Sequence, residues 1–359
     1  MPPRAQRPRS LAFQVFRGSE AVRCGLLTKH QLRSSAWLRV RHDVYADARL
    51  DRDHTLACRA VALRLPATVL LAGPSAAYLH GVEHAASFAD DVHVLTTGSV
   101  RVAAQHGVRV HTSQSDAVPA PAVAFRSPTT DRAGPVPAGL ILAGSPAGPT
   151  GDGPPAGLIL DGSPAGLGGD GPPAGLIQVG PPARSGPAEA AWETAAWLEP
   201  AHAVGIIDTL LRRGLTDHAA LDAVLTERAG QPGSRRAGLA FGLADPAAQS
   251  PPESHLRVRL VLSGLPRPVA QHPIRLPSGR LLHVDLAWPG FRVAVECAGP
   301  GPVDHEQLHR DRERRRQLAA VGWLVLHVTA RRLHRDLSGV LREVHAALTA
   351  GGWQRPRSR

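Results

Sequence analysis

The stretch HVDLAWPGFRVAVECAGPG, residues 283–301, reads as two short strands joined by a tight turn and followed by a glycine-rich break. Both predicted strands are apolar, yet each carries one carboxylate, Asp285 in the first and Glu296 in the second. Acids are costly in a buried hairpin unless a partner compensates their charge. The stretch therefore predicts a sheet whose two acids share a partner.

The length of the turn decides whether the two acids can meet. With a two-residue Pro-Gly loop, Asp285 lies opposite Ala294 and His283 lies opposite Glu296. The two carboxylates then project from one face as diagonal neighbours, about 7–8 Å apart. Pro-Gly is more typical of a type II turn than of the favoured hairpin turns, and a loop of odd length would put the acids on opposite faces.

Two carboxylates at that spacing suit a divalent cation. Phosphodiester cleavage needs a hard cation that activates water and neutralises developing charge, and Mg²⁺ takes few protein ligands, mainly carboxylate oxygens. We therefore expect Asp285 and Glu296 to be metal ligands. The alternative is that both acids lie at strand ends in solvent or pair with arginines.

A third acid precedes the hairpin. Residues 250–265, SPPESHLRVRLVLSGL, predict a helix with Ser250 as N-cap and Glu253 three residues later, which is a capping box and explains Glu253 without any function. The order helix-Glu, strand-Asp, strand-Glu, basic helix is nonetheless that of the restriction-endonuclease-like fold.

Residues 250–348 resemble one family of that PD-(D/E)xK fold, the domain of unknown function related to very-short-patch-repair (Vsr) endonucleases. The matching segments are PESHLR, VDLAWP, VAVE followed by Gly299, and DRERRRQLAAVGWLVLHVT, in which Asp311, Arg314, Leu318 and Gly322–Trp323 keep the family's spacing. The resemblance implies a mixed sheet flanked by helices and a Mg²⁺-dependent DNA endonuclease or nickase.

The resemblance also implies roles for single residues. Asp285 and Glu296 would hold Mg²⁺, Glu253 would support them, and His305 would lie near the scissile phosphate. The family usually has Glu-x-Asp-Gly where this chain has Glu296-Cys297-Ala298-Gly299, and broader relatives have lysine at the position of Ala298. Alanine neither binds metal nor orients water. The alternative function is therefore a non-catalytic, antitoxin-like DNA-binding regulator that uses the nuclease fold as a scaffold.

Residues 304–320 predict the basic helix. Its arginines are expected to bind DNA phosphates through charge and bidentate hydrogen bonds, with a solvated helix face as the alternative. These residues are Arg310, Arg312, Arg314, Arg315 and Arg316. Residues 305–309 also match the H-E-x-x-H pattern of zinc proteases. Arginines where the extended protease pattern needs glycine and histidine, at 312 and 315, disfavour that interpretation.

Residues 25–46, GLLTKHQLRSSAWLRVRHDVYA, resemble the winged-helix start of AbiEi-type antitoxins, and GPSAAYLHGVE at 73–83 resembles the following segment of that family. The resemblance implies a transcriptional repressor with a cognate toxin as partner. The helix expected to enter the major groove, between LRSSA and WLRV, is missing here. Arg33 and Arg41 would then contact the DNA backbone.

We predict an α+β chain (α/β in the broad sense) with four segments. They are a mostly helical N-terminal region at 11–115 with strands near 37–46, 91–97 and 107–113, a disordered Pro/Gly/Ala repeat linker at 117–187, a helical segment at 188–230, and the endonuclease-like domain at 250–350. The repeat has a period of 18 residues, starting at Pro137, Pro155 and Pro173, as slippage of a GC-rich gene would produce. In the helical segment, Thr216 is expected to cap the last helix, and residues 231–249 to form a linker.

Composition limits the partners. The formal net charge of +11 favours a polyanion, which we expect to be DNA, although nearly all the basic residues are arginine and Lys29 is the one lysine. Cys24, Cys58 and Cys297 suggest neither disulfides nor a zinc site. No signal peptide or membrane span is evident, so we expect a cytoplasmic protein without membrane contact. The sequence does not indicate an oligomeric state.

Overall fold

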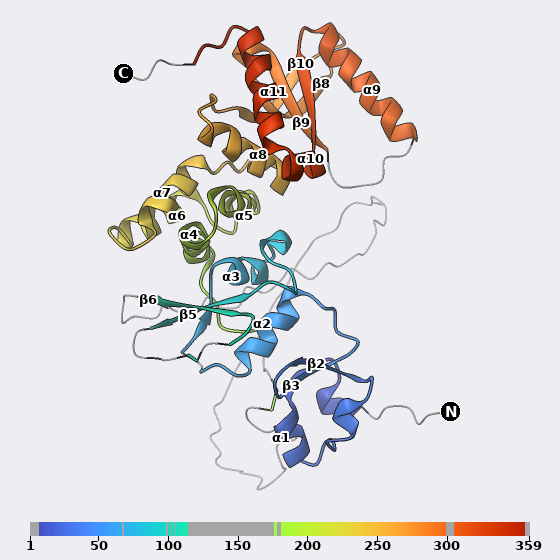
Figure 1. The fold of residues 1–359 in the computed structure, drawn as a ribbon, viewed down its shortest axis with the longest axis vertical. Helices are drawn as coiled ribbons and strands as arrows, with labels where there is room; N and C mark the ends of the chain where they lie inside the picture. The colour runs from blue at the N-terminus through green and yellow to red at the C-terminus, as the bar shows by residue number, and fades with distance from the viewer. Residues whose placement is uncertain are drawn as a thin grey trace, which may run out of the picture.

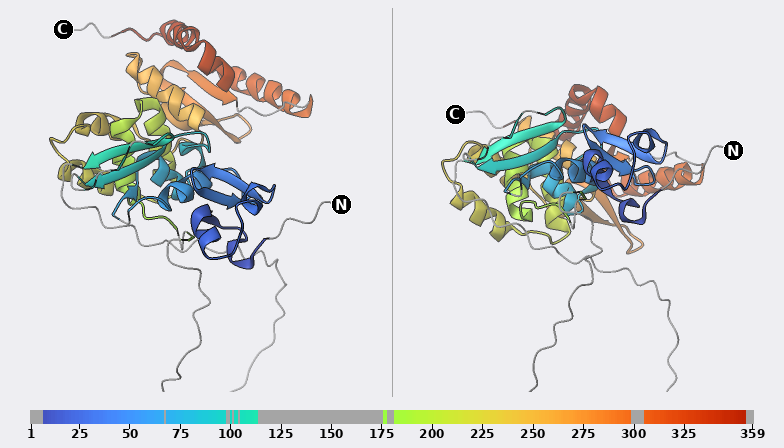
Figure 2. Two further views of the ribbon diagram at one scale, coloured as in Figure 1. Left: turned by 60° about the horizontal axis from the view of Figure 1, so that its bottom comes forward. Right: turned by 90° about the horizontal axis from the view of Figure 1, so that it is seen from below.

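The protein has an α+β fold with a mixed C-terminal sheet, as predicted. The structure, a computed structural model, describes residues 7–66, 68–97, 100, 102–103, 105–113, 176–177, 181–298 and 305–355. Three small sheets and the helices around them occupy these ranges. An N-terminal sheet, a second sheet with a helical segment, and the C-terminal sheet follow one another along the long axis in Figure 1, and the left view of Figure 2 keeps this order.

The N-terminal sheet has the order β1-β3-β2, all antiparallel. Its elements are β1 (Val15–Arg17), α1 (Gly18–Arg23), β2 (Trp37–Arg41) and β3 (Val44–Asp47), followed by α2 (His54–Ala62). The predicted strand near 37–46 is a hairpin that turns at Asp43, whose φ is 59°. The alternating apolar residues predicted to form a strand here pair as β2 and β3, and β1 adds a third strand that was not predicted. Before β2, Gln31–Arg33 forms a 3₁₀ turn, and Thr28 Oγ1 accepts the Gln31 N–H at 3.1 Å.

The second sheet has the order β4-β5-β6, and its two longer strands match the predicted ones. It comprises β4 (Leu70–Leu71), β5 (Val92–Thr97) and β6 (Val108–Ser113), with α3 (Gly73–Leu79) beside β5. The strands β5 and β6 are parallel.

The end of the predicted disordered linker belongs to the fold. Leu176 in the third repeat copy is fully buried in the N-terminal core, and its carbonyl accepts a hydrogen bond from the Arg17 N–H at 3.0 Å. Ile177 forms a β-bridge with Phe16, and Arg184 forms one with Leu71. The linker boundary expected at 187 is therefore wrong for residues 176–177 and 181–187, because Leu176 and Ile177 of this repeat copy pack in the N-terminal core. Most of the repeat lies outside the described residues.

The helical segment extends beyond its predicted end at 230. Its helices are α4 (Pro187–Trp197), α5 (Pro200–Arg212), α6 (His218–Glu227) and α7 (Ser234–Leu243). Helix α7 lies in the predicted linker, where Ala237, Ala240 and Phe241 are buried against the other helices. The cap of α6 is Asp217, whose carboxylate accepts the Ala220 N–H, and not Thr216.

The C-terminal domain follows the predicted element order, with one additional short helix. Its elements are α8 (Pro251–Leu262), β7 (Val269–Arg275), β8 (Leu281–Trp288), β9 (Val293–Ala298), α9 (His305–Ala320), β10 (Leu324–Thr329), α10 (Ala330–Arg335) and α11 (Leu337–Ala350). The sheet order is β10-β9-β8-β7, with β10 parallel to β9 and the other pairs antiparallel. Helices α8 and α11 cover one face, and α9 packs on the other through Leu318.

Helix α8 joins the C-terminal sheet to the helical segment. Leu256 and Leu260 pack on the sheet, whereas Val258 lies in the core formed by α4 to α7. Between them, the fully buried Arg257 guanidinium donates to Asp208 of α5 at 2.6 Å. Asp208 is 1% exposed, so the ion pair is shielded from water on both sides.

Removing the cation of this pair is expected to destabilise the whole protein. The substitution Arg257→Ala leaves Asp208 buried without its partner, which should lower the free energy of unfolding by about 3–5 kcal/mol. Urea denaturation followed by circular dichroism measures the loss. The matched control is Arg332→Ala, which breaks the exposed Arg332–Glu343 pair and should cost about 0–1 kcal/mol. Equal losses in the two variants would contradict the bridging role.

Candidate acid pair and basic helix

Two acids lie together where the first turn of α8 meets the sheet. The Gln271 amide of β7 lies between them, and its Nε2 donates to Glu253 Oε2 and to Asp285 Oδ1, both at 3.2 Å. The other oxygen of Asp285 accepts the Cys297 N–H of β9 at 2.7 Å. The pair therefore consists of a helix acid and a strand acid joined through one neutral amide.

The strands are irregular at this place. Gln271 has a φ of 51°, in the left-handed region, and the register of β7 on β8 skips Gln271 and Asp285 while the rows on either side stay paired. Val284 packs on the α9 side of the sheet, but Leu286 packs on the α8 side, so the alternation of faces changes across Asp285. No sequence pattern marked Gln271, because glutamine in a strand carries no signal of a left-handed residue.

Glu253 is almost fully buried, with 1% of its surface exposed. Its Oε2 accepts the Gln249 N–H at 3.0 Å, whereas its Oε1 has no hydrogen-bond partner among the described residues. Burial raises the pKa of the Glu253 carboxyl to about 7, and the nearby Asp285 adds to the rise. The predicted capping box is half formed: Ser250 Oγ accepts the Glu253 N–H, but the glutamate caps Gln249 and not Ser250.

The predicted hairpin register was wrong by two residues. Trp288 pairs with Val293, and Leu286 pairs with Val295, so the loop has four residues and includes a 3₁₀ turn. Arg292 closes this loop at a φ of 52°. The predicted Asp285–Ala294 pairing does not occur. The ladder ends one row before Asp285 and Glu296 would face each other.

Glu296 contacts an arginine and a histidine on the α9 side of the sheet. Arg314 Nε donates to its Oε1 at 2.6 Å, and His327 Nδ1 lies 3.6 Å from its Oε2. Arg314 also donates to the His283 carbonyl. The structure thus brings Asp285 together with Glu253 and gives Glu296 an arginine partner. Within the described residues, no three or more His, Cys, Asp or Glu side chains are arranged to hold a metal ion.

The remaining residues singled out in the sequence near this site add no described ligand to the acid pair. His305 begins α9, but its side chain and those of His309 and Ala298 lie outside the described part of the chain. Cys297 is next to the acid pair, and burial together with the charge of Asp285 raises the pKa of its thiol. A protonated thiol is a poor metal ligand.

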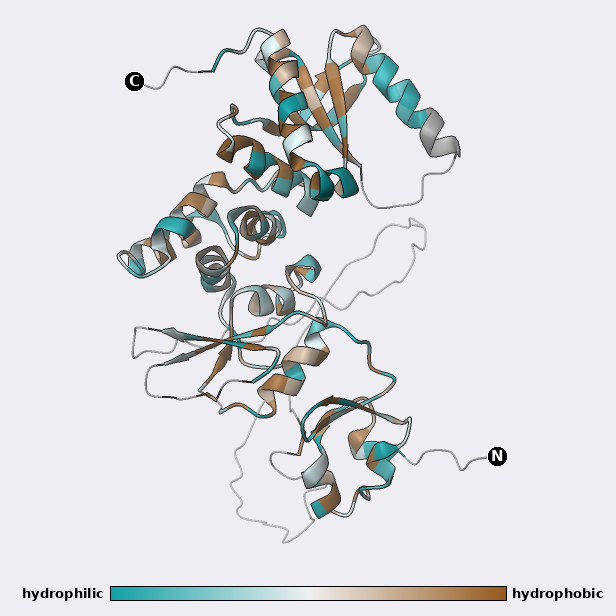
Figure 3. Ribbon diagram, viewed as in Figure 1, coloured by the Kyte–Doolittle hydropathy of each residue, from teal (hydrophilic) through white to brown (hydrophobic). Residues whose placement is uncertain are grey.

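Helix α9 carries the basic surface. Arg310, Arg312, Arg315 and Arg316 are exposed, whereas Arg314 points inward to Glu296 and Leu318 is buried against the sheet. Figure 3 shows that most of α9 is hydrophilic, in contrast to the strands beside it. Arg314 contacts Glu296, and Asp285 accepts the N–H of the adjacent Cys297, so the middle of α9 lies at the same end of the sheet as Asp285.

The two N-terminal arginines differ from each other. Arg41 donates to the carbonyl oxygens of His106 and Gly107, each at 2.8 Å, and so ties the β2–β3 hairpin to the second sheet. Arg33 is exposed at the end of its 3₁₀ turn. Residues 34–36 alone separate that turn from β2, so no further helix lies between them.

Comparison with known proteins identifies relatives without a known activity. The chain is 30% identical over 158 residues to two uncharacterized proteins of Mycobacterium tuberculosis, one from strain CDC 1551 / Oshkosh and one from strain ATCC 25618 / H37Rv. The match covers 42% of this chain and 56% of each relative. No family model and no solved structure matches the chain. In the described part of the chain, every helix is too short or too polar to cross a membrane.

The raised pKa of Glu253 predicts a pH-dependent stability. The native carboxyl keeps its proton up to about pH 7, whereas the unfolded one loses it near 4.5. The stabilisation that Glu253 contributes is therefore fully present below pH 4.5 and is lost as the pH rises through 7. Across that window the free energy of unfolding of the wild type should fall by about 3 kcal/mol relative to that of Glu253→Gln. Denaturant unfolding of both proteins at several pH values measures the difference. A difference independent of pH would contradict the assignment.

Proposed function

We propose that the C-terminal domain is a Mg²⁺-dependent DNA endonuclease or nickase whose metal is held by Glu253 and Asp285. The observation that carries the proposal is the buried Glu253 Oε1, which has no partner among the described residues and belongs to an acid beside a second acid. Two carboxylates that share a site repel each other unless a proton or a cation neutralises one of them.

The residues present fit Mg²⁺. This ion keeps several waters and needs only one or two carboxylates, so a pair suffices. Glu253 would offer Oε1, and Asp285 would offer Oδ1 once the Gln271 amide turns away. The bound ion would activate water and neutralise charge on the phosphate. The exposed arginines of α9 would grip the neighbouring phosphates, and Arg314 would brace that helix through Glu296.

Two observations favour the alternative, a non-catalytic DNA-binding regulator of the antitoxin type with a cognate toxin as partner. Glu296 is neutralised by Arg314, and Ala298 has no polar side chain where broader relatives of the endonuclease family carry lysine. A domain of this kind would bind DNA through α9 and leave the strand intact. The resemblance of residues 25–46 to antitoxin winged helices supports the same alternative.

Plasmid nicking separates the two functions. Supercoiled plasmid incubated with protein and Mg²⁺ should be nicked by the wild type, and Asp285→Asn or Glu253→Gln should lower the rate by at least the roughly 10–100-fold typical of residues that support a metal. The matched control is Glu193→Gln. Glu193 lies in α4, away from the acid pair, and it is also a buried glutamate whose pKa is raised by burial to about 7. Salt-sensitive binding without nicking would support the regulator.

DNA binding by α9 has its own test. In Arg312→Gln/Arg316→Gln, the slope of log affinity against log salt should become shallower by about 0.9 for each phosphate that the helix no longer neutralises. Fluorescence anisotropy with a labelled duplex measures the slope. The control Arg235→Gln/Arg342→Gln removes two exposed arginines elsewhere and should leave it unchanged. An unchanged slope in the α9 variant would show that its arginines form only a solvated surface.

A further inference from the structure

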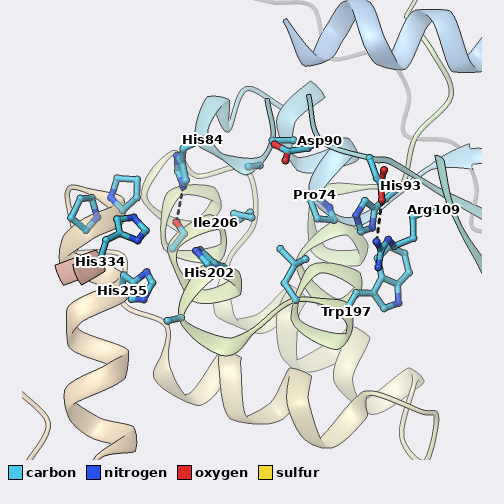
Figure 4. Close-up of a pocket in the computed structure, with 18 of the residues that line it drawn as sticks. Pro74, His84, Asp90, His93, Arg109, Trp197, His202, Ile206, His255 and His334 are labelled. Carbon is cyan, nitrogen blue, oxygen red and sulfur yellow. Dashed lines mark hydrogen bonds and ion pairs between the residues drawn. The ribbon is translucent and has the colours of Figure 1, made fainter. Parts of the chain in front are cut away.

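A cavity of about 760 Å³ lies where the second sheet, the helical segment and the C-terminal domain meet. Its walls come from α3, β5, β6, α4, α5, α8 and α10, and neither resemblance assigns it a role. Figure 4 shows Trp197 and His93 on one side of it and His202, His255 and His334 on the other. Its size suits a small organic ligand.

One side of the cavity is an aromatic surface. Trp197, at the end of α4, stacks on His111 of β6 with the two rings within 5° of parallel, and His93 of β5 stacks beside both. Burial lowers the pKa of His93 and His111 to about 4, so both rings are neutral at physiological pH. Neutral, parallel rings favour a flat aromatic ligand over a charged one.

The other side is a row of imidazoles from three helices. The ring of His255 in α8 lies 5.1 Å from that of His202 in α5 and 6.4 Å from that of His334 in α10. Burial, together with the neighbouring His202, lowers the pKa of His255 to about 4. His255 Nε2 accepts the Arg259 Nε–H at 3.4 Å, so the Nδ1–H of the neutral ring remains as a donor to an acceptor on the edge of a nucleobase. Asp90 adds a carboxylate to the lining, and it suits an exocyclic amine.

The charges disfavour a phosphate as the ligand. Arg109 is the arginine of the lining, and it is paired with Asp91 at 3.0 Å. Asp90 adds a negative charge to the same wall. The lining thus combines stacked aromatic rings with the neutral imidazole of His255 and the Asp90 carboxylate, which is the chemistry of a pocket for a base rather than for its phosphate.

The cavity and the acid pair lie on two sides of the first turn of α8. Pro251, Pro252 and His255 line the cavity, whereas Glu253 reaches Gln271 beside Asp285. A helix is about 10–12 Å across, so about one helix diameter separates the cavity from the acid pair.

We propose that this cavity receives a nucleobase extruded from the DNA strand that lies at the acid pair. The inference rests on the proposed DNA-binding function. Extrusion breaks stacking and pairing and is least costly for a base that has no partner. The protein should therefore prefer a duplex with one unpaired base over a fully paired duplex.

Binding without Mg²⁺ tests this preference apart from cleavage. In anisotropy titrations the wild type should bind a duplex with a single bulged adenosine about 10-fold more tightly than the paired duplex. The variants Trp197→Ala and His334→Ala should lose this preference while keeping their affinity for the paired duplex. His218→Ala, an exposed histidine outside the cavity, should keep both. Thermal melting of each variant verifies that it is folded.

An abasic nucleotide at the bulge is the decisive control. It keeps the flexible backbone but removes the base, so the preference should disappear. A preference that persists with the abasic bulge, or in Trp197→Ala, overturns the proposal.

A second measurement keeps the proposal testable if the protein binds no DNA. Saturation-transfer NMR with free 2′-deoxyadenosine should show contact with the wild type and His218→Ala but not with Trp197→Ala. Absence of contact with the wild type would overturn the pocket. Contact without DNA binding or nicking would instead reject the proposed function and leave a nucleoside pocket.

Discussion

The buried ion pair between Arg257 and Asp208 sets the arrangement of the molecule. An arginine inside an apolar core is tolerated only with a compensating charge, and Asp208 provides it from another helix. The pair fixes the rotation of α8, because Arg257 must face the helical segment while Leu256 and Leu260 face the sheet. With that rotation, Glu253 reaches the sheet and His255 reaches the cavity. The orientation of α8 therefore places both candidate sites.

The negative charges of Glu253 and Glu296 are compensated in two different ways. Glu296 is accessible to α9, so Arg314 compensates its charge. Glu253 is buried out of reach of α9, and it is balanced by a retained proton near neutral pH. A cation at this position would replace that proton. The chemistry proposed for the domain follows from this difference in access between the two faces of the sheet.

The sequence predicted the elements of the C-terminal domain because its periodicities and caps are local signals. It failed at the hairpin register, since the left-handed Arg292 lengthens the loop and no residue pattern required this. The prediction of a linker at 231–249 was also wrong: its glycines and arginines suggested a loop, but the segment forms α7, and Phe241 is buried in the core of the helical segment. The pairing of Asp285 with Glu253 depends on the irregular row at Gln271. Such long-range placements arise from packing, which single-sequence patterns do not encode.

The third repeat copy contributes a residue to the folded core. Leu176 is a core residue, whereas the equivalent leucines of the earlier copies, at 140 and 158, lie outside the described residues. Tandem DNA repeats gain and lose whole units during replication. A change in copy number that keeps the last unit also keeps the leucine that the core needs. Alleles that differ in repeat number but end in the same unit would therefore all retain Leu176, whereas a polar substitution at Leu176 would remove an apolar side chain from the N-terminal core.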